Sequence, residues 1–308
     1  MDEFDVVIVG GGPAGLSAAL ALARARRTAL LLDGNEPRNT VTDAAHNFFT
    51  RDGAHPLELR RIGGDQLAPY VTIDVADGSV DHAEGMNGGF HLRLAGGREI
   101  EARKLILATG VQDVLPEIEG LREIWGTSAF VCPYCDGWEV RDQPWAVLVP
   151  PPALSLMAVF LQTWTRDLVM LTNGIEVDDA LRNSLAALGV SLRTEPIARF
   201  EHGGSDLQRI VFGSGAAIER SALLLRPQLV PRTALAEQLG CELIPDGPIP
   251  GLIQVDQMFQ TSVRGVFAVG DVVTPMQSIA QAVSSGHVAG AAANHDFALE
   301  MLALAGAE

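Results

Sequence analysis

The sequence is poor in basic residues and has no long uninterrupted apolar run. Its 308 residues include 22 lysines and arginines against 38 aspartates and glutamates, which gives a net charge of −16 at pH 7. Because nucleic acids and anionic membrane surfaces are bound through clustered positive charge, neither is expected as a partner. The most apolar stretch, residues 145–160, contains three prolines, which excludes a membrane-spanning helix there.

Cysteine is also scarce, with three residues in the whole chain. Cys132 and Cys135 form a C-x-x-C pair and Cys241 stands alone, so the sequence lacks the disulfide framework of a small secreted domain. This usage indicates a reducing, cytoplasmic environment with one active dithiol. Cys241 is expected to be a small buried apolar side chain.

A strand, a glycine-rich loop, a helix and a second strand open the chain. Residues 4–9 are valine-rich, residues 16–27 are rich in alanine and leucine, and residues 28–32 form a second apolar run. This order is typical of a dinucleotide-binding βαβ unit. Asp33, which ends the second run 23 residues after Gly10, is placed to bind a ribose hydroxyl.

The loop reads Gly-Gly-Gly-Pro-Ala-Gly at residues 10–15. In such a loop one glycine allows a tight turn, one lets a pyrophosphate approach the backbone, and one lets the helix pack closely on the strand. The start of the helix then faces the phosphates with unpaired N–H groups and a partial positive charge. The loop residues expected to hold the cofactor are Gly10, Gly12, Pro13, Ala14 and Gly15.

Two later segments favour FAD over NAD as the cofactor. Thr109 and Gly110 follow one apolar run, and Gly270 and Asp271 follow another near the C-terminus. Both resemble the segments with which flavoenzymes of two dinucleotide domains close over FAD. We therefore expect an α/β fold with two Rossmann-like dinucleotide-binding domains of the three-layer ββα type, the second inserted into the first. The expected bounds are 1–115 and 247–308 for the FAD-binding domain and 116–246 for the inserted redox domain.

The C-x-x-C pair is the second chemically active feature. Its two thiols are close enough to form a disulfide, and the N–H groups of a helix start can lower the pKa of one of them. Asp136, directly after Cys135, can pass a proton to or from a leaving thiol. A zinc site would need two further cysteine or histidine ligands at matching spacing, and none lies near in the sequence, so no metal is expected. A pair of inert or structural thiols is the other alternative.

These motifs resemble those of the low-molecular-weight thioredoxin reductase family over almost the whole chain. The similar segments are the glycine loop, Cys-Pro-Tyr-Cys-Asp-Gly from Cys132, and the Gly-Asp pair at 270–271. The resemblance implies that Cys135 lies nearest the flavin, that Cys132 exchanges with the substrate, and that Asp136 is the general acid–base residue. It also implies a homodimer.

The same resemblance assigns residues around the flavin ring. Asn47 would bind near the isoalloxazine, and Gln281 and Ala282, at the start of the last helix, would face the pyrimidine end of the ring with a helix dipole. For His46, a role beside the flavin competes with simple packing of its loop. The last helix is expected over residues 281–304 and is apolar enough to share in a dimer contact.

Residues 46–53 and the nine residues from Cys132 are more similar to a subgroup of this family. That NADPH-independent subgroup includes dithiol oxidases acting on metabolites such as gliotoxin and holomycin. Those oxidases often carry histidine after the second cysteine, whereas Asp136 here is similar to the true reductases.

A second nucleotide loop is due between a strand expected at 145–149 and a helix expected at 154–164. A nicotinamide site would want glycine at 149 and 151 and glycine or alanine at 154, but the chain has Val149, Pro151 and Leu154. Proline has no N–H donor and its ring blocks backbone approach. Losing two or three charge-assisted hydrogen bonds costs about 3–9 kcal/mol, roughly two to six orders of magnitude in affinity. We expect a degenerate NAD(P)H site, with an unorthodox NADPH site as the alternative.

The sequence thus predicts an FAD-dependent thiol–disulfide oxidoreductase that works without NADPH. Its expected partner is a thioredoxin-like protein, with another electron donor such as ferredoxin. One alternative is a dithiol oxidase that passes electrons from a small dithiol to oxygen. Another is a non-catalytic flavin-binding redox sensor, against which the intact dithiol with its adjacent acid argues.

Overall fold

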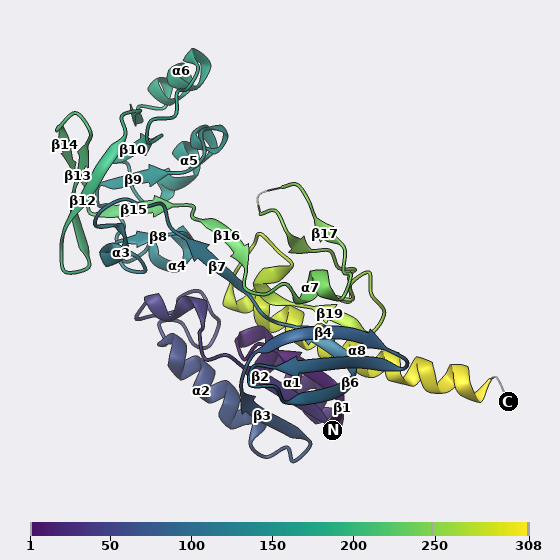
Figure 1. Ribbon diagram of the computed structural model, residues 1–308. Helices are drawn as coiled ribbons and strands as arrows, with labels where there is room; N and C mark the ends of the chain where they lie inside the picture. The colour runs from purple at the N-terminus through teal and green to yellow at the C-terminus, as the bar shows by residue number, and fades with distance from the viewer. Residues whose placement is uncertain (1, 248, 307–308) are drawn as a thin grey trace.

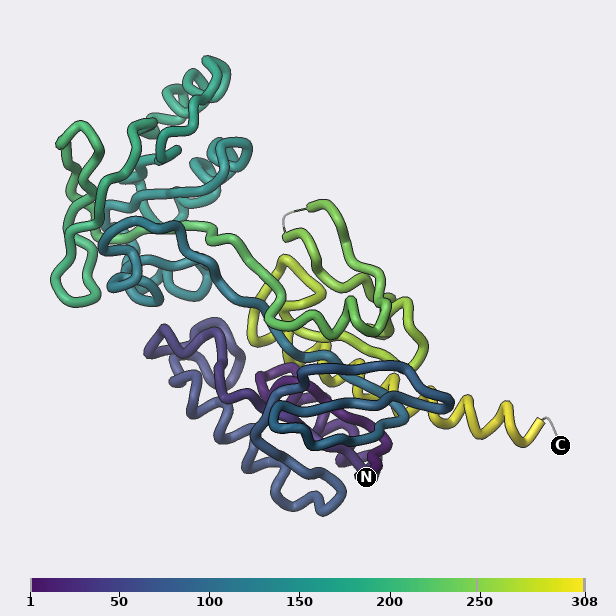
Figure 2. The backbone as a smooth tube through the Cα atoms, viewed as in Figure 1, coloured from purple at the N-terminus to yellow at the C-terminus, as the bar shows by residue number. Residues whose placement is uncertain are grey.

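The computed structural model describes residues 2–247 and 249–306, which form two lobes joined by two crossing strands (Figure 1). The N-terminal and C-terminal segments lie together in one lobe, and the middle of the chain forms the other, as the colours of Figure 2 show. The insertion expected from the sequence is therefore visible in the path of the chain.

A seven-stranded sheet forms the centre of the first lobe. Its order is β3-β2-β1-β6-β5-β4, and β19 pairs in parallel with the C-terminal half of β6. The valines and isoleucine of residues 6–9 are buried, which explains why this run becomes the central strand β1. The strands are β1 (Asp2–Val9), β2 (Ala29–Asp33), β3 (Ile73–Asp77), β4 (Val80–Met86), β5 (Gly89–Leu94), β6 (Glu99–Leu107) and β19 (Val266–Ala268).

Two helices, α1 (Pro13–Arg24) and α8 (Ile279–Ala305), pack closely together against one face of this sheet. A Cβ on Gly286 would lie 2.0 Å from the carbonyl oxygen of Ala14, so only glycine allows this approach. The contact holds the start of α8 against the glycine loop that precedes α1. Helix α1 begins three residues before the predicted residue 16, because Pro13 is accommodated in the first turn. The helix α2 (Pro56–Leu67) packs beside α1.

The inserted lobe contains a five-stranded parallel sheet of order β11-β10-β9-β15-β8. The antiparallel strands β12 to β14 share a buried cluster with one face of this sheet, and α5 and α6 share a cluster with the other. The strands are β8 (Ala129–Phe130), β9 (Trp145–Leu148), β10 (Leu168–Leu171), β11 (Ser191–Arg193), β12 (Ile197–Gly203), β13 (Asp206–Phe212), β14 (Ala217–Glu219) and β15 (Ala222–Leu225). The helices are α3 (Leu121–Ile124), α4 (Pro133–Asp136), α5 (Leu154–Phe160) and α6 (Asp179–Ala187). The α/β class with two Rossmann-type units is confirmed.

The two crossing strands, β7 (Val111–Val114) and β16 (Gln228–Pro231), pair in antiparallel orientation. After β16 the chain packs at once into the first lobe through α7 (Leu235–Gln238), and Leu235, Ala236 and Cys241 join the core beneath its sheet. Residues 235–241, which lie within the range expected for the insert, therefore pack in the first lobe, because their apolar side chains are buried there. The remaining strands, β17 (Leu243–Ile244) and β18 (Leu252–Ile253), form a short hairpin.

No helix within residues 2–247 and 249–306 has the length and apolar character needed to cross a membrane. The last turns of α8 project away from the first lobe (Figure 1). Met301, Leu302 and Leu304 are exposed there.

Candidate active site

The first glycine loop has the geometry of a phosphate cradle. Gly10 has φ +118°, and a Cβ on it would lie 2.2 Å from the carbonyl oxygen of Ala108. A Cβ on Gly15 would lie 1.9 Å from the carbonyl oxygen of Gly10, so this position holds helix α1 against the loop. Gly12 faces open space, and the start of α1 carries no side-chain cap. The backbone there is free to meet a pyrophosphate, which fits FAD.

Asp33 lies directly beside this loop. A Cβ on Gly11 would lie 2.1 Å from Asp33 Oδ2, so the second glycine of the loop is also required. Asp33 Oδ1 accepts from the N–H of Asn35 at 2.9 Å, and Oδ2 accepts from Arg60 Nε at 3.0 Å. Sequence reasoning missed Gly11 and Arg60. Arg60 lies on α2 and has no motif of its own.

The Gly-Asp pair near the C-terminus, residues 270–271, lies beside the first glycine loop. Gly270, with φ +76°, approaches Ala14 so closely that a Cβ on it would lie 3.1 Å from the Ala14 Cβ. Its N–H donates to the buried Ser285 Oγ of α8 at 3.0 Å. The structure thus brings residues 10–15 and 270–271 together, although about 255 residues separate them in the chain.

Asp271 belongs to a charged network centred on Arg38, which lies on the 3₁₀ turn Arg38–Val41. Arg38 donates to both carboxylate oxygens of Asp113, at 2.7 and 2.6 Å, and to Asp271 Oδ2 at 2.9 Å. Burial raises the pKa of Asp271, and the charge of Arg38 opposes that rise. Because Asp113 lies on the crossing strand β7, Arg38 links Asp271 to the connection between the two lobes.

Of three other expected flavin contacts, Asn47 lies in the loop between η1 (Arg38–Val41) and α2, and Gln281 and Ala282 lie in the first turn of α8. Asn47 adopts the left-handed φ of +60° and its N–H donates to Asp52 Oδ1 at 2.7 Å. The N–H of Gln281 donates to the capping Ser278 Oγ at 3.1 Å, and Ala282 is buried in the first turn of α8.

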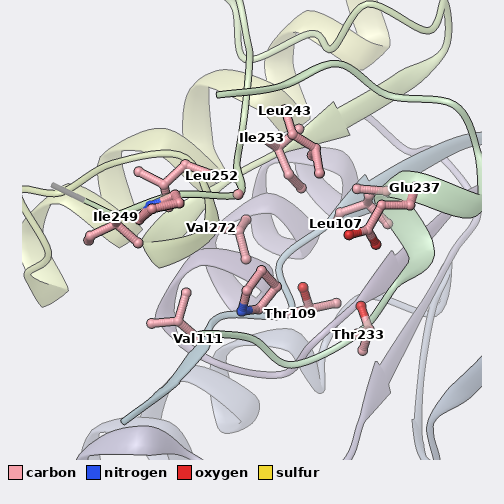
Figure 3. A pocket seen from close by; sticks show the side chains of 14 residues that line it. Leu107, Thr109, Val111, Thr233, Glu237, Leu243, Ile249, Leu252, Ile253 and Val272 are labelled. Carbon is pink, nitrogen blue, oxygen red and sulfur yellow. The ribbon is translucent and has the colours of Figure 1, made fainter. Parts of the chain in front are cut away.

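Thr109, which follows β6, lines a cavity of about 10 Å³ together with apolar side chains of the returning chain (Figure 3). A cavity of that volume holds about one water molecule, so it is no ligand site. Gly110, with φ +68°, forms the turn into β7.

The dithiol occupies the short helix α4. Cys132 is its N-cap, and the Cys132 carbonyl accepts from the N–H groups of Cys135 and Asp136, each at 3.1 Å. Both sulfurs are free thiols on half-buried residues. A hydrogen bond from Cys135 lowers the pKa of the Cys132 thiol, whereas the same hydrogen bond and burial raise the pKa of Cys135. Cys132 is therefore the thiol that ionises first.

The charge of Arg38 opposes the rise in the pKa of Cys135. The same guanidinium therefore acts on Asp271 of the cofactor region and on the dithiol of the other lobe. Its carboxylate partners are 75 and 233 residues away in the sequence, and no local pattern could have identified it.

A group of ionisable side chains surrounds Asp136. Burial, and next the charge of Glu139, raise the pKa of Asp136 to about 6, and His46 opposes that rise. His46 comes from the first lobe, and its Nε2 lies 3.5 Å from Glu139 Oε1. A carboxyl group with a pKa near neutrality is suited to exchange protons with a thiol.

Aromatic side chains lie beside the dithiol. Tyr134, between the cysteines, is 60% exposed and packs edge-on against Trp164 at 5.3 Å between ring centroids. Trp138 is 66% exposed and carries the Arg141 guanidinium 4.0 Å from its ring centroid. The dithiol segment therefore carries two exposed aromatic side chains.

The second loop differs from the first in its hydrogen-bond donors. Residues 150–152 are prolines and supply no N–H. In the 3₁₀ turn Pro151–Ala153, the N–H of Ala153 donates to the Pro150 carbonyl at 2.9 Å and the N–H of Leu154 to that of Pro151. Within residues 150–154, all of which the structure describes, every backbone donor is absent or already used. The following helix α5 ends at Phe160, and a 3₁₀ turn, Leu161–Thr163, replaces the rest of the predicted helix.

In a nicotinamide domain the loop after β10 binds the 2′-phosphate of NADPH. Here the side chains of this loop are hydrogen-bonded within the inserted lobe. Thr172 Oγ1 donates to the Ile175 carbonyl at 2.6 Å, and Asn173 Oδ1 accepts from the N–H of Ile197 at 2.8 Å. Arg193, at the end of β11, is paired with Glu195 at 2.7 Å. In residues 2–247 and 249–306, no group of three or more histidine, cysteine, aspartate or glutamate side chains is arranged to hold a metal ion.

Comparison with known proteins gives extensive matches. The profile of the family described as pyridine nucleotide-disulphide oxidoreductase matches residues 4–150 and 164–286. The gap in this match, residues 151–163, contains the proline turn and α5. The departure from the family pattern therefore falls on the second loop.

Individual relatives match along nearly the whole chain. Thioredoxin reductase tcpT of Claviceps purpurea is 35% identical, covering 93% of this chain and 92% of that protein. Thioredoxin reductase sirT of Leptosphaeria maculans is 31% identical, covering 94% and 93%. Among solved structures, an oxidoreductase from Agrobacterium tumefaciens is 40% identical with a TM-score of 0.90, covering 97% of this chain and 99% of that one.

Proposed function

The chain belongs to the pyridine nucleotide-disulphide oxidoreductase family as a thioredoxin-reductase-like, flavin-dependent enzyme, and from this premise we propose that it exchanges electrons between FAD, its dithiol and an external disulfide without a nicotinamide cofactor. The cradle at residues 10–15, with Asp33, Gly270 and Asp271, would hold the FAD. When bound, FAD supplies two-electron redox chemistry to the dithiol.

The observation that carries this proposal is the loop at residues 150–154. In the first loop, Gly12 and the uncapped start of α1 leave the backbone open to a pyrophosphate. In the second, three prolines lack donors and the two remaining N–H groups are bonded within the turn. Losing two or three charge-assisted hydrogen bonds costs about 3–9 kcal/mol, so a micromolar nicotinamide site would weaken to a Kd of about 0.1 mM or higher.

The side chains of the dithiol have separate parts in the exchange. The Cys132 thiolate attacks one sulfur of the partner disulfide, forming a mixed disulfide and releasing a partner thiolate. Cys135 then attacks the Cys132 sulfur, which closes the Cys132–Cys135 disulfide and releases the second partner sulfur. The two protons lost by the cysteines end on the partner's thiols, and Asp136 passes the proton of Cys135.

The proposed partner is a thioredoxin-like protein, with an electron donor such as ferredoxin that reduces the flavin. The relatives from Claviceps purpurea and Leptosphaeria maculans carry the name thioredoxin reductase, which supports a protein disulfide as the substrate. A homodimer that covers the exposed end of α8 and a cytoplasmic location belong to the same proposal.

The test is anaerobic reduction of the FAD-loaded protein by dithionite, followed by mixing with an oxidised thioredoxin-like protein. Reoxidation of the flavin by the wild type, lost in Cys135→Ser, is the expected result. A flavin that stays reduced in the presence of excess disulfide would exclude the proposed electron flow. A rate no faster than that of free flavin would favour a redox sensor.

One observation favours a second function. Tyr134 and Trp138, both more than half exposed beside the dithiol, would suit a small apolar dithiol as well as a protein surface. In that case the enzyme would be a dithiol oxidase with oxygen as acceptor. Catalytic oxygen consumption with dithiothreitol in air, abolished by Cys135→Ser, would support the oxidase. Slow, non-catalytic consumption would exclude it.

A further inference from the structure

The proposed function requires one proton at the step between flavin and dithiol. Reduction of the Cys132–Cys135 disulfide takes up two electrons and two protons. Reduced flavin would supply the two electrons and one proton, so the other proton must enter a half-buried site, and in the reverse reaction with dithiothreitol it must leave. Asp136 lies next to Cys135 and is only partly exposed. More exposed side chains beside it would connect it with solvent.

His46 lies between this site and the surface. It approaches from the first lobe, and its Nε2 is 3.5 Å from Glu139 Oε1 on the dithiol segment. Its Nδ1 is 3.6 Å from Asp52 Oδ1 on its own loop. The side chain of His46 is 24% exposed, against 45% for Glu139 and 70% for Asp52. The imidazole therefore stands between a sheltered acid and two carboxylates that reach solvent.

The loop that carries His46 is built to hold it in place. The N–H of Ala45 donates to the Ala54 carbonyl at 2.8 Å, and the N–H of Gly53 donates back to the Ala45 carbonyl at 3.0 Å. Asp52 Oδ1 also accepts from the N–H of Asn47 at 2.7 Å, and this bond holds the carboxylate 3.6 Å from His46 Nδ1. These hydrogen bonds close the loop and hold the His46 side chain of the first lobe against the dithiol segment of the inserted lobe.

We propose that His46 is a positioning residue of the dithiol, which sets the protonation of Asp136 through Glu139 and carries this proton between the site and solvent along Asp52. Imidazole takes up and gives up a proton near neutral pH, which suits a relay between carboxylates. The charged groups that face it are Asp52 from its own loop and Asp136 and Glu139 from the dithiol segment. The inference rests on the proposed flavin–dithiol exchange.

The experiment compares the FAD-loaded full chain with His46→Gln and a matched control, His202→Gln. His202 lies on β12, where its Nδ1 is 2.7 Å from the Gly204 carbonyl oxygen in a surface hairpin. Flavin reduction by dithiothreitol is followed by anaerobic stopped flow between about pH 5.5 and 8.5. At neutral pH, His46→Gln should be slower by about tenfold, less than the hundredfold or more expected for a direct proton-transfer group, because His46 acts through Glu139. His202→Gln should match the wild type.

The pH profile separates a proton role from a merely structural one. Because the charge of His46 lowers the pKa of Asp136, its removal should move the acid limb of the profile to higher pH. His46→Ala should regain rate when imidazole is added to the buffer, whereas a misfolded loop would not. The double variant with Glu139→Gln should be no slower than His46→Gln, because both changes break the same link.

The outcomes distinguish this inference from the function on which it rests. If the wild-type flavin is not reduced by dithiothreitol, or is reduced as fast in Cys135→Ser, the flavin–dithiol exchange itself is wrong. If the wild type behaves as proposed but the His46→Gln profile superimposes on it, His46 has no part in proton movement. Additive losses in the double variant would also overturn the relay.

Discussion

Replacing Asp136 by asparagine should stabilise the protein at alkaline pH while slowing its chemistry. The folded-state pKa of Asp136 is about 6, raised above the ordinary 3.8 by burial and by Glu139. A raised pKa means that folding favours the protonated acid, so its contribution to stability is complete below about pH 3.8 and is lost as the pH rises through about 6. Above that range the ionised side chain costs about 3 kcal/mol, at 1.36 kcal/mol for each pH unit between the two values.

Asparagine cannot ionise, so Asp136→Asn should remove this cost. The expected gain in the free energy of unfolding is up to about 3 kcal/mol at pH 8 and about half of that at pH 5. Urea titrations of wild type and variant, at equal FAD saturation and at both pH values, measure it directly. The same variant should reduce the flavin with dithiothreitol roughly a hundredfold more slowly, because its proton-transfer group is gone. Equal unfolding midpoints at both pH values would refute the assignment of a buried, destabilised acid.

Four further substitutions have different expected effects on FAD binding, stability and redox activity. Gly12→Ala should weaken FAD binding by roughly tenfold or more, about 1.4 kcal/mol, and leave the apoprotein as stable as before, because its Cβ meets only the open space of the cradle. Gly15→Ala should instead destabilise the apoprotein by about 1–3 kcal/mol, and equal unfolding midpoints for the two variants would contradict this contrast. Lys104→Met should cost roughly 3–5 kcal/mol in a thermal or urea titration, because this lysine is 1% exposed and paired with two carboxylates of α8. Cys241→Ser should leave dithiothreitol-driven flavin reduction unchanged, since this thiol is buried in the first lobe beside Thr261, and a lost rate would show a third redox cysteine.

The cradle and the two lobes could be predicted from sequence because their signals are local. Glycine spacing, valine runs and the C-x-x-C pair each act within about 30 residues, the length of one βαβ unit. Arg38 could not be found in this way, because its partners Asp113 and Asp271 come from the crossing strand and the C-terminal segment. The lobe that residues 235–241 enter could not be predicted either, because these residues have no pattern that indicates which core they join.

The second loop shows what a sequence can and cannot predict. The absence of glycine at 149, 151 and 154 is visible in the sequence, but the hydrogen bonds within the proline turn are visible only in the structure. His46 was ambiguous for a similar reason. Its neighbour Glu139 lies in the other lobe, and only the folded chain places the two 3.5 Å apart.

The most direct test of nicotinamide independence is anaerobic stopped-flow mixing of the FAD-loaded protein with excess NADPH, with dithiothreitol as the parallel reductant. The visible absorbance of the oxidised flavin is followed in both. If residues 150–154 have lost their phosphate site, the flavin stays oxidised with NADPH and is bleached by dithiothreitol in the wild type but not in Cys135→Ser. Rapid bleaching by NADPH would show that the proline turn still binds a nicotinamide nucleotide, and would contradict the proposed function.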